Sequence, residues 1–331
     1  FVSALALALG AAGCSDDSSS SPADGGMKKD TGTTQKDTGP APTIDCKTNT
    51  CNTFVFNQLI VPATGPDALK YGYDYDGNQV VDNALGNIIA AVATAMSGVN
   101  IQDSVDLAVN GGQAILLVEM QAADLTTDPN AVLQAHVGKQ KDCCPGKEDD
   151  PAGCKAATIA TGGCFSGEGS FEISDASPKD AIIKGSIAGG EMAFGPARLA
   201  LQIPLNAQST ITVNLKEARI KGKVTANGIK DGVLSGVIPK GDIDNSVLPA
   251  IHTLLDGILK DPNTQESTKT AIFSFFDKDG DKAVTLDEIK NSDVIKTFAG
   301  GDVDVDNDGE PELSLGIGFE AVKATITAAS N

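Results

Sequence analysis

The residues whose types and spacing most clearly predict chemistry lie between Asp277 and Glu288, in the run DKDGDKAVTLDE. Counted from the first residue, positions 1, 3, 5, 7, 9 and 12 hold Asp277, Asp279, Asp281, Ala283, Thr285 and Glu288. Ala283 can contribute only its backbone carbonyl, whereas the other five offer side-chain oxygens. A 12-residue loop with this spacing wraps six to eight oxygens around a hard cation such as Ca²⁺. The run therefore predicts a calcium site.

Apolar residues flank this loop at helical spacing and one lies inside it at position 8: Ile272, Phe273, Phe276, Ile289 and Val284. With these flanks the stretch resembles an EF-hand, and the resemblance implies a helix–loop–helix unit that binds Ca²⁺. Position 6 of an EF-hand loop is normally Gly with positive φ, but here it is Lys282. We expect Lys282 to weaken the site, and Lys282→Gly to tighten it. An acidic surface turn without metal is the alternative interpretation of the same residues.

A second acidic loop occurs near the N-terminal end of the chain, and we call it the N-terminal acidic loop (residues 74–82). Its oxygens lie at positions 1, 3, 5 and 9, held by Asp74, Asp76, Asn78 and Asp82. Position 12 is Leu85, which supplies no carboxylate. Apolar residues from Leu85 to Met96 then follow one face of a predicted helix. The loop is either a calcium site or a plain turn and helix cap.

A third acidic run forms the C-terminal acidic loop (residues 304–312), with oxygens from Asp304, Asp306, Asp308, Glu310 and Glu312. Gly309 stands at position 6, where a positive φ is needed. Position 12 is Leu315, and Pro311 has no N–H for the short bridge that couples paired EF-hands. The loop resembles the Asp-x-Asp-x-Asp-Gly loops of dockerin and thrombospondin type 3 repeats. That resemblance implies Ca²⁺ binding.

The first 14 residues indicate export. Residues 1–9 are an uncharged apolar run too short to span a bilayer, and small residues lead from there to Cys14. This resembles the end of a bacterial lipoprotein signal peptide, which implies that Cys14 carries the lipid and that the given sequence begins inside the signal. An ordinary secretory signal with an incidental cysteine is the alternative. Both predict export, and the lipidated form would reside in the cell envelope, at the outer membrane or cell surface.

Residues 15–45 contain Ser, Asp, Gly, Thr, Pro and Lys with almost nothing apolar. Such a segment cannot bury enough surface to offset the entropy lost on ordering. We predict a flexible tether between a lipid anchor at Cys14 and a folded body.

Six further cysteines are Cys46, Cys51, Cys143, Cys144, Cys154 and Cys164. An even number in an exported chain predicts disulfide bonds. Cys46 and Cys51 are close enough to close one small loop, and the other four belong to a predicted disulfide-rich insert at 143–164. Their connectivity cannot be derived from sequence. A zinc site formed by His136 and Cys143 is the alternative.

The remaining pattern predicts an α+β fold that is mainly β. Residues 46–244 form a β-rich body, because apolar residues alternate along 199–205 and 211–215 without intervening helical crossovers. The alternation slips at Lys216–Glu217, which predicts a bulge. We expect an antiparallel sandwich or roll. A helical EF-hand unit follows at 245–311, capped by Asn245 or Ser246, and residues 312–331 return to the β body as a strand.

Composition narrows the function further. The chain has 25 basic and 44 acidic residues in 331, a formal charge of −19, which disfavours nucleic acid and anionic membrane surfaces as partners. No nucleophile elbow, phosphate loop, dinucleotide fingerprint or zinc-protease motif occurs. We therefore predict a calcium-binding, membrane-anchored exported lipoprotein that is not an enzyme, in which the metal is mainly structural. The alternatives are a carbohydrate-acting enzyme that uses paired carboxylates, and a cell-surface adhesin with a cell-surface or glycan partner.

Overall fold

The structure is a computed structural model that describes residues 8–9, 44–46, 51–62, 64–95, 101–110, 112, 114–140, 164–175, 177, 181–206, 209–262, 264–298 and 301–328. The predicted lipidation site Cys14, most of the predicted tether and three of the cysteines (Cys143, Cys144 and Cys154) lie outside the described residues. The predictions made for them therefore stay predictions.

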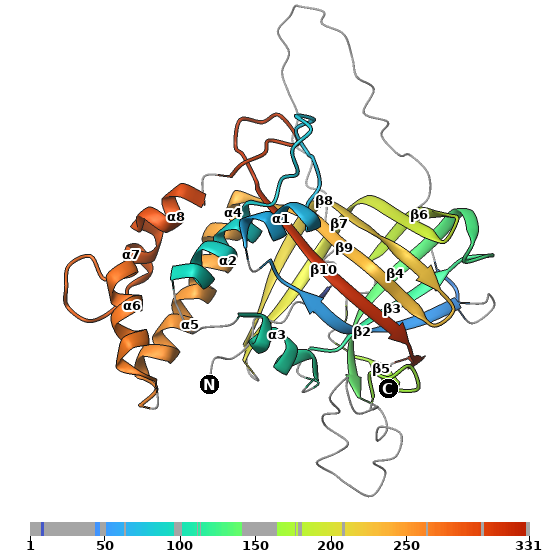
Figure 1. The fold of residues 1–331 in the computed structure, drawn as a ribbon, viewed down its shortest axis with the longest axis horizontal. Coiled ribbons are helices and arrows are strands. Elements are labelled where there is room, and N and C mark those ends of the chain that lie inside the picture. The colour runs from blue at the N-terminus through green and yellow to red at the C-terminus, as the bar shows by residue number, and fades with distance from the viewer. Residues whose placement is uncertain are drawn as a thin grey trace, which may run out of the picture.

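Eight strands form a closed antiparallel barrel (Figure 1). They are β2 (Cys51–Ile60), β3 (Leu116–Gln121), β4 (Thr127–Gln140), β6 (Ile182–Ala188), β7 (Glu191–Asn206), β8 (Ser209–Thr225), β9 (Gly228–Ile238) and β10 (Leu313–Lys323). Each pairs with the next in this order, and β10 pairs back with β2.

The mainly β, antiparallel class is confirmed, but the sandwich or roll was wrong. A sandwich needs sheet edges, whereas here β6 bonds to both β4 and β7, and β10 bonds to both β9 and β2. Closure of this kind removes the exposed edges that an open antiparallel sheet would leave.

Apolar side chains fill the barrel, as the narrow interior of an eight-stranded barrel requires. Along β2 and β10 the inward positions include Phe56 and Phe319, whose rings stack with centroids 4.4 Å apart. The same core includes Leu116 and Val118 of β3 and Leu133 of β4, all nearly inaccessible to solvent. The described part of the barrel interior is therefore a packed apolar core.

Of the described strands, three short ones lie outside the barrel ring. β5 (Ser170–Ile173) pairs with β4 and, in parallel, with β11 (Thr325–Thr327), and β1 (Ala8–Leu9) pairs with β7. A second apolar cluster packs between β5 and the outer face of β2 and β3, and it includes Val55, Leu117 and Phe171.

One predicted small disulfide loop is present. Cys46 and Cys51 are bonded with a Cα–Cα distance of 5.2 Å. Cys164 is also disulfide-bonded.

In the part of the chain that the structure describes, helices occupy two connections of the barrel. α1 (Gly65–Tyr71), α2 (Ala84–Ala95) and α3 (Ile101–Asn110) lie between β2 and β3. Between β9 and β10 come α4 (Lys240–Asp242), the π-helical turn η2 (Ile243–Val247), α5 (Leu248–Lys260), α6 (Glu266–Phe276), α7 (Leu286–Asn291) and α8 (Asp293–Phe298). α5 packs against α6 and α7, and α2 contacts both α8 and β10 (Figure 1).

The predicted cap at Asn245 or Ser246 was wrong. The chain is already helical from Lys240, and both residues lie inside the π-helical turn. The polar residues were misread as a cap because apolar periodicity begins only at Val247. Asp242, which precedes Asn245 by three residues, bonds to the barrel: its carboxylate accepts a hydrogen bond from the backbone N–H of Asn214 on β8.

The bulge predicted in β8 is confirmed. The pairing of β8 with β9 shifts register between Lys216 and Arg219, and Glu217 has a φ of 50°. A bulge re-aims the side chains next to it. Here the side chains of Lys216 and Arg219 and the backbone carbonyl of Glu217 contact the two acidic loops, or Tyr73 beside them, as described below.

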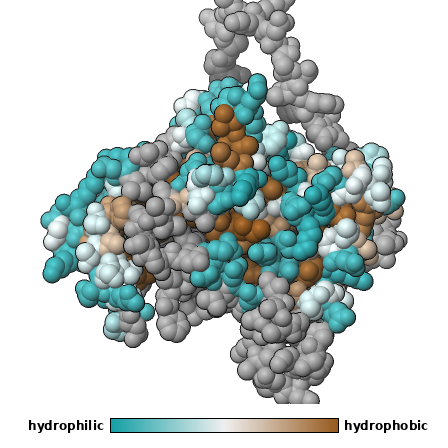
Figure 2. Space-filling model, in the orientation of Figure 1, coloured by the Kyte–Doolittle hydropathy of each residue, from teal (hydrophilic) through white to brown (hydrophobic). Residues whose placement is uncertain are grey.

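Hydrophilic side chains cover most of the described surface in Figure 2, and the apolar groups form interrupted patches. The large apolar side chains that are most exposed include Leu69 of α1 and Val80 of the N-terminal acidic loop. Among the described residues, no helix combines the length and apolar character that crossing a membrane requires.

Candidate metal sites

The three acidic loops share one backbone conformation. In each, the residues at positions 4 and 6 have positive φ: Gly77 (76°) and Gln79 (70°), Gly280 (77°) and Lys282 (64°), and Asn307 (58°) and Gly309 (86°). Non-glycine residues rarely adopt this region, because the Cβ approaches the backbone. The same backbone path therefore recurs in three sequences that are far apart in the chain.

Hydrogen bonds to the first carboxylate maintain this path. The position 6 N–H donates to the position 1 carboxylate in all three loops, with N···O distances of 2.9 Å to Asp74, 3.0 Å to Asp277 and 3.1 Å to Asp304. The position 7 N–H likewise donates to the position 5 side chain, at 2.6 to 2.8 Å. These bonds turn the chain around a common centre and direct the acidic side chains towards it.

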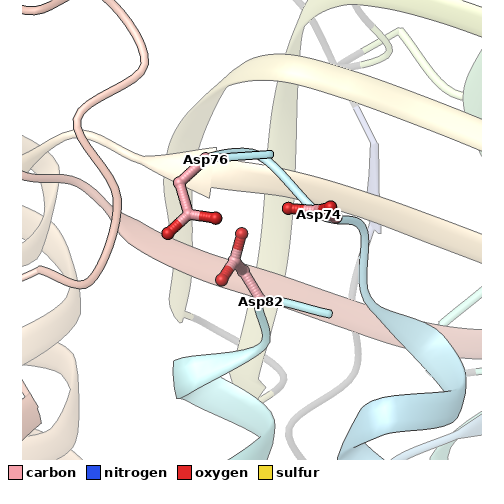
Figure 3. A group of neighbouring side chains, drawn as sticks. All are labelled: Asp74, Asp76 and Asp82. Carbon is pink, nitrogen blue, oxygen red and sulfur yellow. The ribbon is translucent and has the colours of Figure 1, made fainter. Parts of the chain in front are cut away.

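In the N-terminal acidic loop, the structure brings together Asp74, Asp76 and Asp82, with ligand oxygens within 4.8 Å of one another (Figure 3). Asp82 is at position 9, and its carboxylate also accepts the backbone N–H of Tyr75 at 2.7 Å. Burial raises the pKa of Asp82 above its ordinary value, since desolvation penalises the carboxylate. The side-chain oxygen of Asn78 accepts the N–H of Val80.

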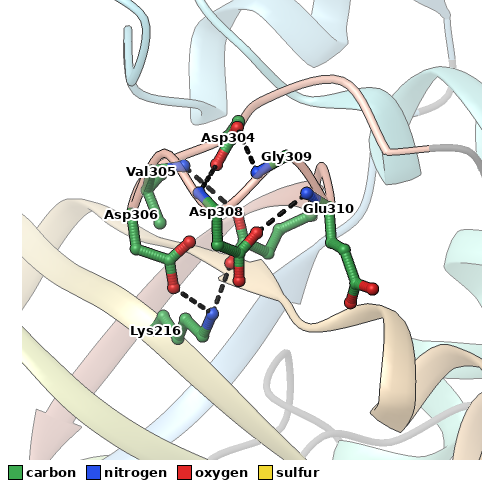
Figure 4. A network of polar contacts seen from close by, with 8 residues as sticks. Lys216, Asp304, Val305, Asp306, Asp308, Gly309 and Glu310 are labelled. Carbon is green, nitrogen blue, oxygen red and sulfur yellow. Dashed lines mark hydrogen bonds and ion pairs between the residues drawn. The ribbon is translucent and has the colours of Figure 1, made fainter. Parts of the chain in front are cut away.

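In the C-terminal acidic loop, Asp304, Asp306 and Asp308 form the corresponding group (Figure 4). Glu312 at position 9 is 1% exposed, and one of its oxygens accepts the N–H of Val305 at 3.2 Å. Glu310 is exposed and does not belong to the group, although its N–H donates to Asp308. Three of the five predicted oxygen donors of this loop, all of them aspartates, therefore converge on one another.

An ammonium also enters this loop. Lys216 Nζ lies 2.7 Å from Asp306 and 2.5 Å from Glu312. The contact with Lys216 holds the pKa of Asp306 below its ordinary value, and the two carboxylates raise the pKa of Lys216, Asp306 contributing most.

In the EF-hand-like loop (residues 277–288), Asp277, Asp279 and Asp281 converge, and Val284 is buried. The loop joins α6 to α7, as the helical flanks predict. The outward-facing Ala283 donates its N–H to Asp281.

Glu288 does not belong to that group of three aspartates. One of its oxygens accepts the N–H and the hydroxyl of Thr285, both at 2.8 Å, and the other accepts the N–H of Lys278 at 3.0 Å. The hydrogen bonds that Thr285 donates hold the pKa of Glu288 below its ordinary value, and the bond from the backbone N–H contributes most. Thr285 and Glu288 thus form a capping box at the start of α7.

The two terminal acidic loops are structural counterparts of each other. Each is closed by an antiparallel bridge from the residue before position 1 to position 9, Tyr73 to Asp82 and Val303 to Glu312. In each, the position 9 carboxylate accepts the N–H of position 2. In the EF-hand-like loop, Glu288 at position 12 does this instead. Sequence counting by the 12-residue frame of the EF-hand did not reveal this shorter, nine-residue form.

Both of these loops dock on the bulge of β8. The hydroxyl of Tyr75 lies 3.4 Å from the carbonyl oxygen of Glu217, and the guanidinium of Arg219 lies 4.2 Å above the ring of Tyr73. Lys216 contacts the C-terminal acidic loop from the same bulge. The sequence predicted the bulge but carried no signal that it would meet loops about 90 and 140 residues away.

The zinc alternative finds no support at His136. Its Nε2 lies 3.1 Å from Glu119 and its Nδ1 lies 3.5 Å from the hydroxyl of Ser177, so both ring nitrogens face protein partners. Cys143 lies outside the described residues.

No protein-family model matches the chain, and no curated protein or solved structure shows significant similarity to it. The inference of function therefore rests on the loops themselves.

Proposed function

We propose that the chain is a calcium-binding, membrane-anchored exported lipoprotein in which the metal mainly stabilises the fold. The observation that supports this most is the shared geometry of the three acidic loops. Each has left-handed backbone at positions 4 and 6 and three convergent aspartates. A single acidic turn would carry little weight, since Asp and Gly are common in turns.

The donor chemistry favours Ca²⁺ over other cations. The converging groups are carboxylates, without Cys or His, which disfavours zinc and copper. The loops are exposed and irregular, with different ligand sets, whereas Mg²⁺ requires near-ideal octahedral geometry and keeps several waters. Ca²⁺ accepts variable oxygen shells, which suits loops of this kind.

A structural role follows from where the loops lie. The N-terminal and C-terminal acidic loops precede α2 and β10, and the EF-hand-like loop joins α6 to α7. Neutralising clustered carboxylates there would relieve their mutual repulsion and secure the connections. Outside the cell, Ca²⁺ is also fairly constant and high, so a regulatory switch would have little to sense.

Thermal unfolding with Ca²⁺ and with a chelator tests the stabilisation. Free Ca²⁺ at about a hundred times the Kd adds roughly 2.7 kcal/mol per site, so chelation should lower the Tm by several degrees. Asp74→Asn, Asp277→Asn and Asp304→Asn should each reduce this difference. Asp287→Asn, the same change at position 11 of the EF-hand-like loop, is the matched control. Identical melting curves with and without chelator would contradict the proposal.

Membrane attachment has a separate test. Expressed behind a complete signal peptide, the wild-type chain should fractionate with membranes and Cys14→Ser should not, since the thioether to the lipid can no longer form. Retention of the variant in membranes would exclude Cys14 as the anchor.

A further inference from the structure

The ammonium of Lys216 occupies a specific place in the C-terminal acidic loop (Figure 4). It contacts Oδ2 of Asp306 at 2.7 Å and Oε1 of Glu312 at 2.5 Å, and these residues stand at loop positions 3 and 9. Lys216 itself comes from β8, about 90 residues earlier in the chain. One positive charge from the barrel therefore engages two carboxylates of a proposed cation loop.

Burial explains why this ion pair is needed. The side chain of Glu312 is 1% exposed, and that of Lys216 is 24% exposed. A buried carboxylate requires a counter-charge or hydrogen bonds, and Glu312 has both, since its second oxygen accepts the N–H of Val305. Lys216 thus compensates Glu312 and reaches Asp306 with the same group.

The N-terminal acidic loop offers an internal comparison, because it has the same bridge and backbone. Its position 9 residue, Asp82, converges with Asp74 and Asp76. In the C-terminal acidic loop, Glu312 pairs with Lys216 and does not join the three converging aspartates. Among the described residues, no lysine or arginine forms an ion pair with the aspartates of the N-terminal acidic loop.

We propose that Lys216 is a built-in counter-ion of the C-terminal acidic loop, which lowers its affinity for Ca²⁺ by competing for Asp306 and Glu312. This inference rests on the proposed function of the loop. The competitor is part of the chain, so its local concentration does not change with the composition of the medium. A monovalent ion carries no more charge than the ammonium it would replace, whereas a divalent ion carries twice as much. Lys216 is therefore a residue that determines both affinity and selectivity for divalent ions.

Calorimetric titration with Ca²⁺ tests the inference in the full chain, with the other two loops disabled by Asp74→Asn and Asp277→Asn. In this background Lys216→Met, which keeps the aliphatic stem and removes the charge, should bind Ca²⁺ roughly tenfold more tightly, or about 1.4 kcal/mol. Lys223→Met is the matched control on the same strand. Lys223 forms an ion pair with Asp231, at 2.9 Å, which belongs to none of the acidic loops. Its affinity should be unchanged.

The sign of the effect separates competition from a merely structural role. If Lys216 only holds the loop in shape, Lys216→Met weakens Ca²⁺ binding or leaves it unchanged, and the inference is wrong while the proposed function stands. If the background protein and Lys216→Met both bind no Ca²⁺ that depends on Asp304, the proposed function fails for this loop, and the inference fails with it.

Removing Lys216 leaves Glu312 without its counter-charge, so folding of the variant is checked by circular dichroism. If Lys216→Met does not fold, two other variants replace it: Glu312→Gln alone, and Glu312→Gln combined with Lys216→Met. Neither of them retains an unpaired buried carboxylate. The double variant should bind Ca²⁺ more tightly than Glu312→Gln alone, owing to the loss of repulsion at Asp306. Equal or weaker binding would overturn the inference.

Discussion

Position 6 is occupied by a different residue in each acidic loop, yet the backbone there is left-handed in all three. A residue with a Cβ pays about 1–2 kcal/mol for this conformation, and the greater freedom of Gly in the unfolded chain offsets about 0.4–1 kcal/mol of that. Lys282→Gly should therefore raise the free energy of unfolding by about 1 kcal/mol, and Gly309→Ala should lower it by a similar amount.

Thermal melting of both variants measures the prediction, since about 1 kcal/mol corresponds to a Tm shift of about 2–4 °C. A Cβ on Gly309 would meet no atom within 4 Å, so backbone strain alone is tested there. Lys282→Gly should also tighten Ca²⁺ binding by removing an ammonium, whereas Glu288→Gln should weaken it. Shifts of the same sign in both variants would refute the strain argument.

Tyr75 provides a pH-dependent test of the docked N-terminal acidic loop. Burial raises the pKa of its phenol from 10.0 to about 12, because the phenolate would lose its solvation. A raised pKa in the folded state means that the resulting stability is fully present below pH 10 and is lost as the pH rises towards 12. The protein should therefore lose stability in this interval, and Tyr75→Phe should lose less.

The chain contains three tyrosines and no tryptophan, so phenolate absorbance can resolve this group. In the folded wild-type protein we expect one tyrosine to ionise later than the others, and this late step should be absent from Tyr75→Phe. If all three ionise together while the protein is still folded, Tyr75 is not buried against the β8 bulge.

At the scale of elements, Asn83 connects α1, α2 and β10. Its Nδ2 donates to the carbonyls of Ala68 (3.0 Å) and Gly316 (2.9 Å), and its Oδ1 accepts the N–H groups of Gly86 and Gly316, both at 2.9 Å. The side chain is 2% exposed and follows directly after Asp82. Asn83 therefore fixes the end of the N-terminal acidic loop to β10, the strand that follows the C-terminal acidic loop.

Asn83→Ala should lower the free energy of unfolding by about 3 kcal/mol, because it leaves several buried backbone groups without partners. Asn227→Ala, at an exposed turn, is the control and should change it by less than about 0.5 kcal/mol. Denaturant unfolding measures both values. A loss below 1 kcal/mol for Asn83→Ala would show that water replaces its hydrogen bonds.

The strands and the bulge were largely predictable from the sequence, whereas the pairing of one strand with another was not. Period-two alternation predicted the antiparallel strands, and the slip at Lys216 predicted the bulge, because both are local properties of the chain. Alternation does not specify which strand a given strand pairs with, so closure by β10 on β2 could not be read from it. The cap at Asn245 failed because a π-helical turn has no distinctive local signal.

The candidate sites likewise combine local features, which the sequence predicted, with non-local contacts, which it did not. Ligand spacing is local, and the aspartates at positions 1, 3 and 5 that it singled out do converge in the EF-hand-like loop and the C-terminal acidic loop. The contact between the segments that follow the two terminal acidic loops is not local, since the hydroxyl of Ser314 accepts the N–H of Ala84 from 230 residues away. Lys216 was missed for this reason, because its role depends on the closed barrel that presents it.

In the whole molecule, both terminal acidic loops dock on the barrel at the bulge of β8. β8 supplies the bulge, and β10 begins where the C-terminal acidic loop ends. The EF-hand-like loop lies in the helical connection between β9 and β10. We therefore interpret the three proposed calcium sites as parts of one folded unit, so that their loss should affect the stability of the whole.

Calorimetric titration of the mature chain measures whether the acidic loops bind Ca²⁺. We predict saturable binding with Kd values on the order of 10⁻⁴–10⁻³ M, as in extracellular modules. Each of Asp74→Asn, Asp277→Asn and Asp304→Asn should remove one binding event, and the triple variant should bind no Ca²⁺. A wild-type protein that shows no saturable binding, or a triple variant that binds like the wild type, would rule out calcium binding by these loops.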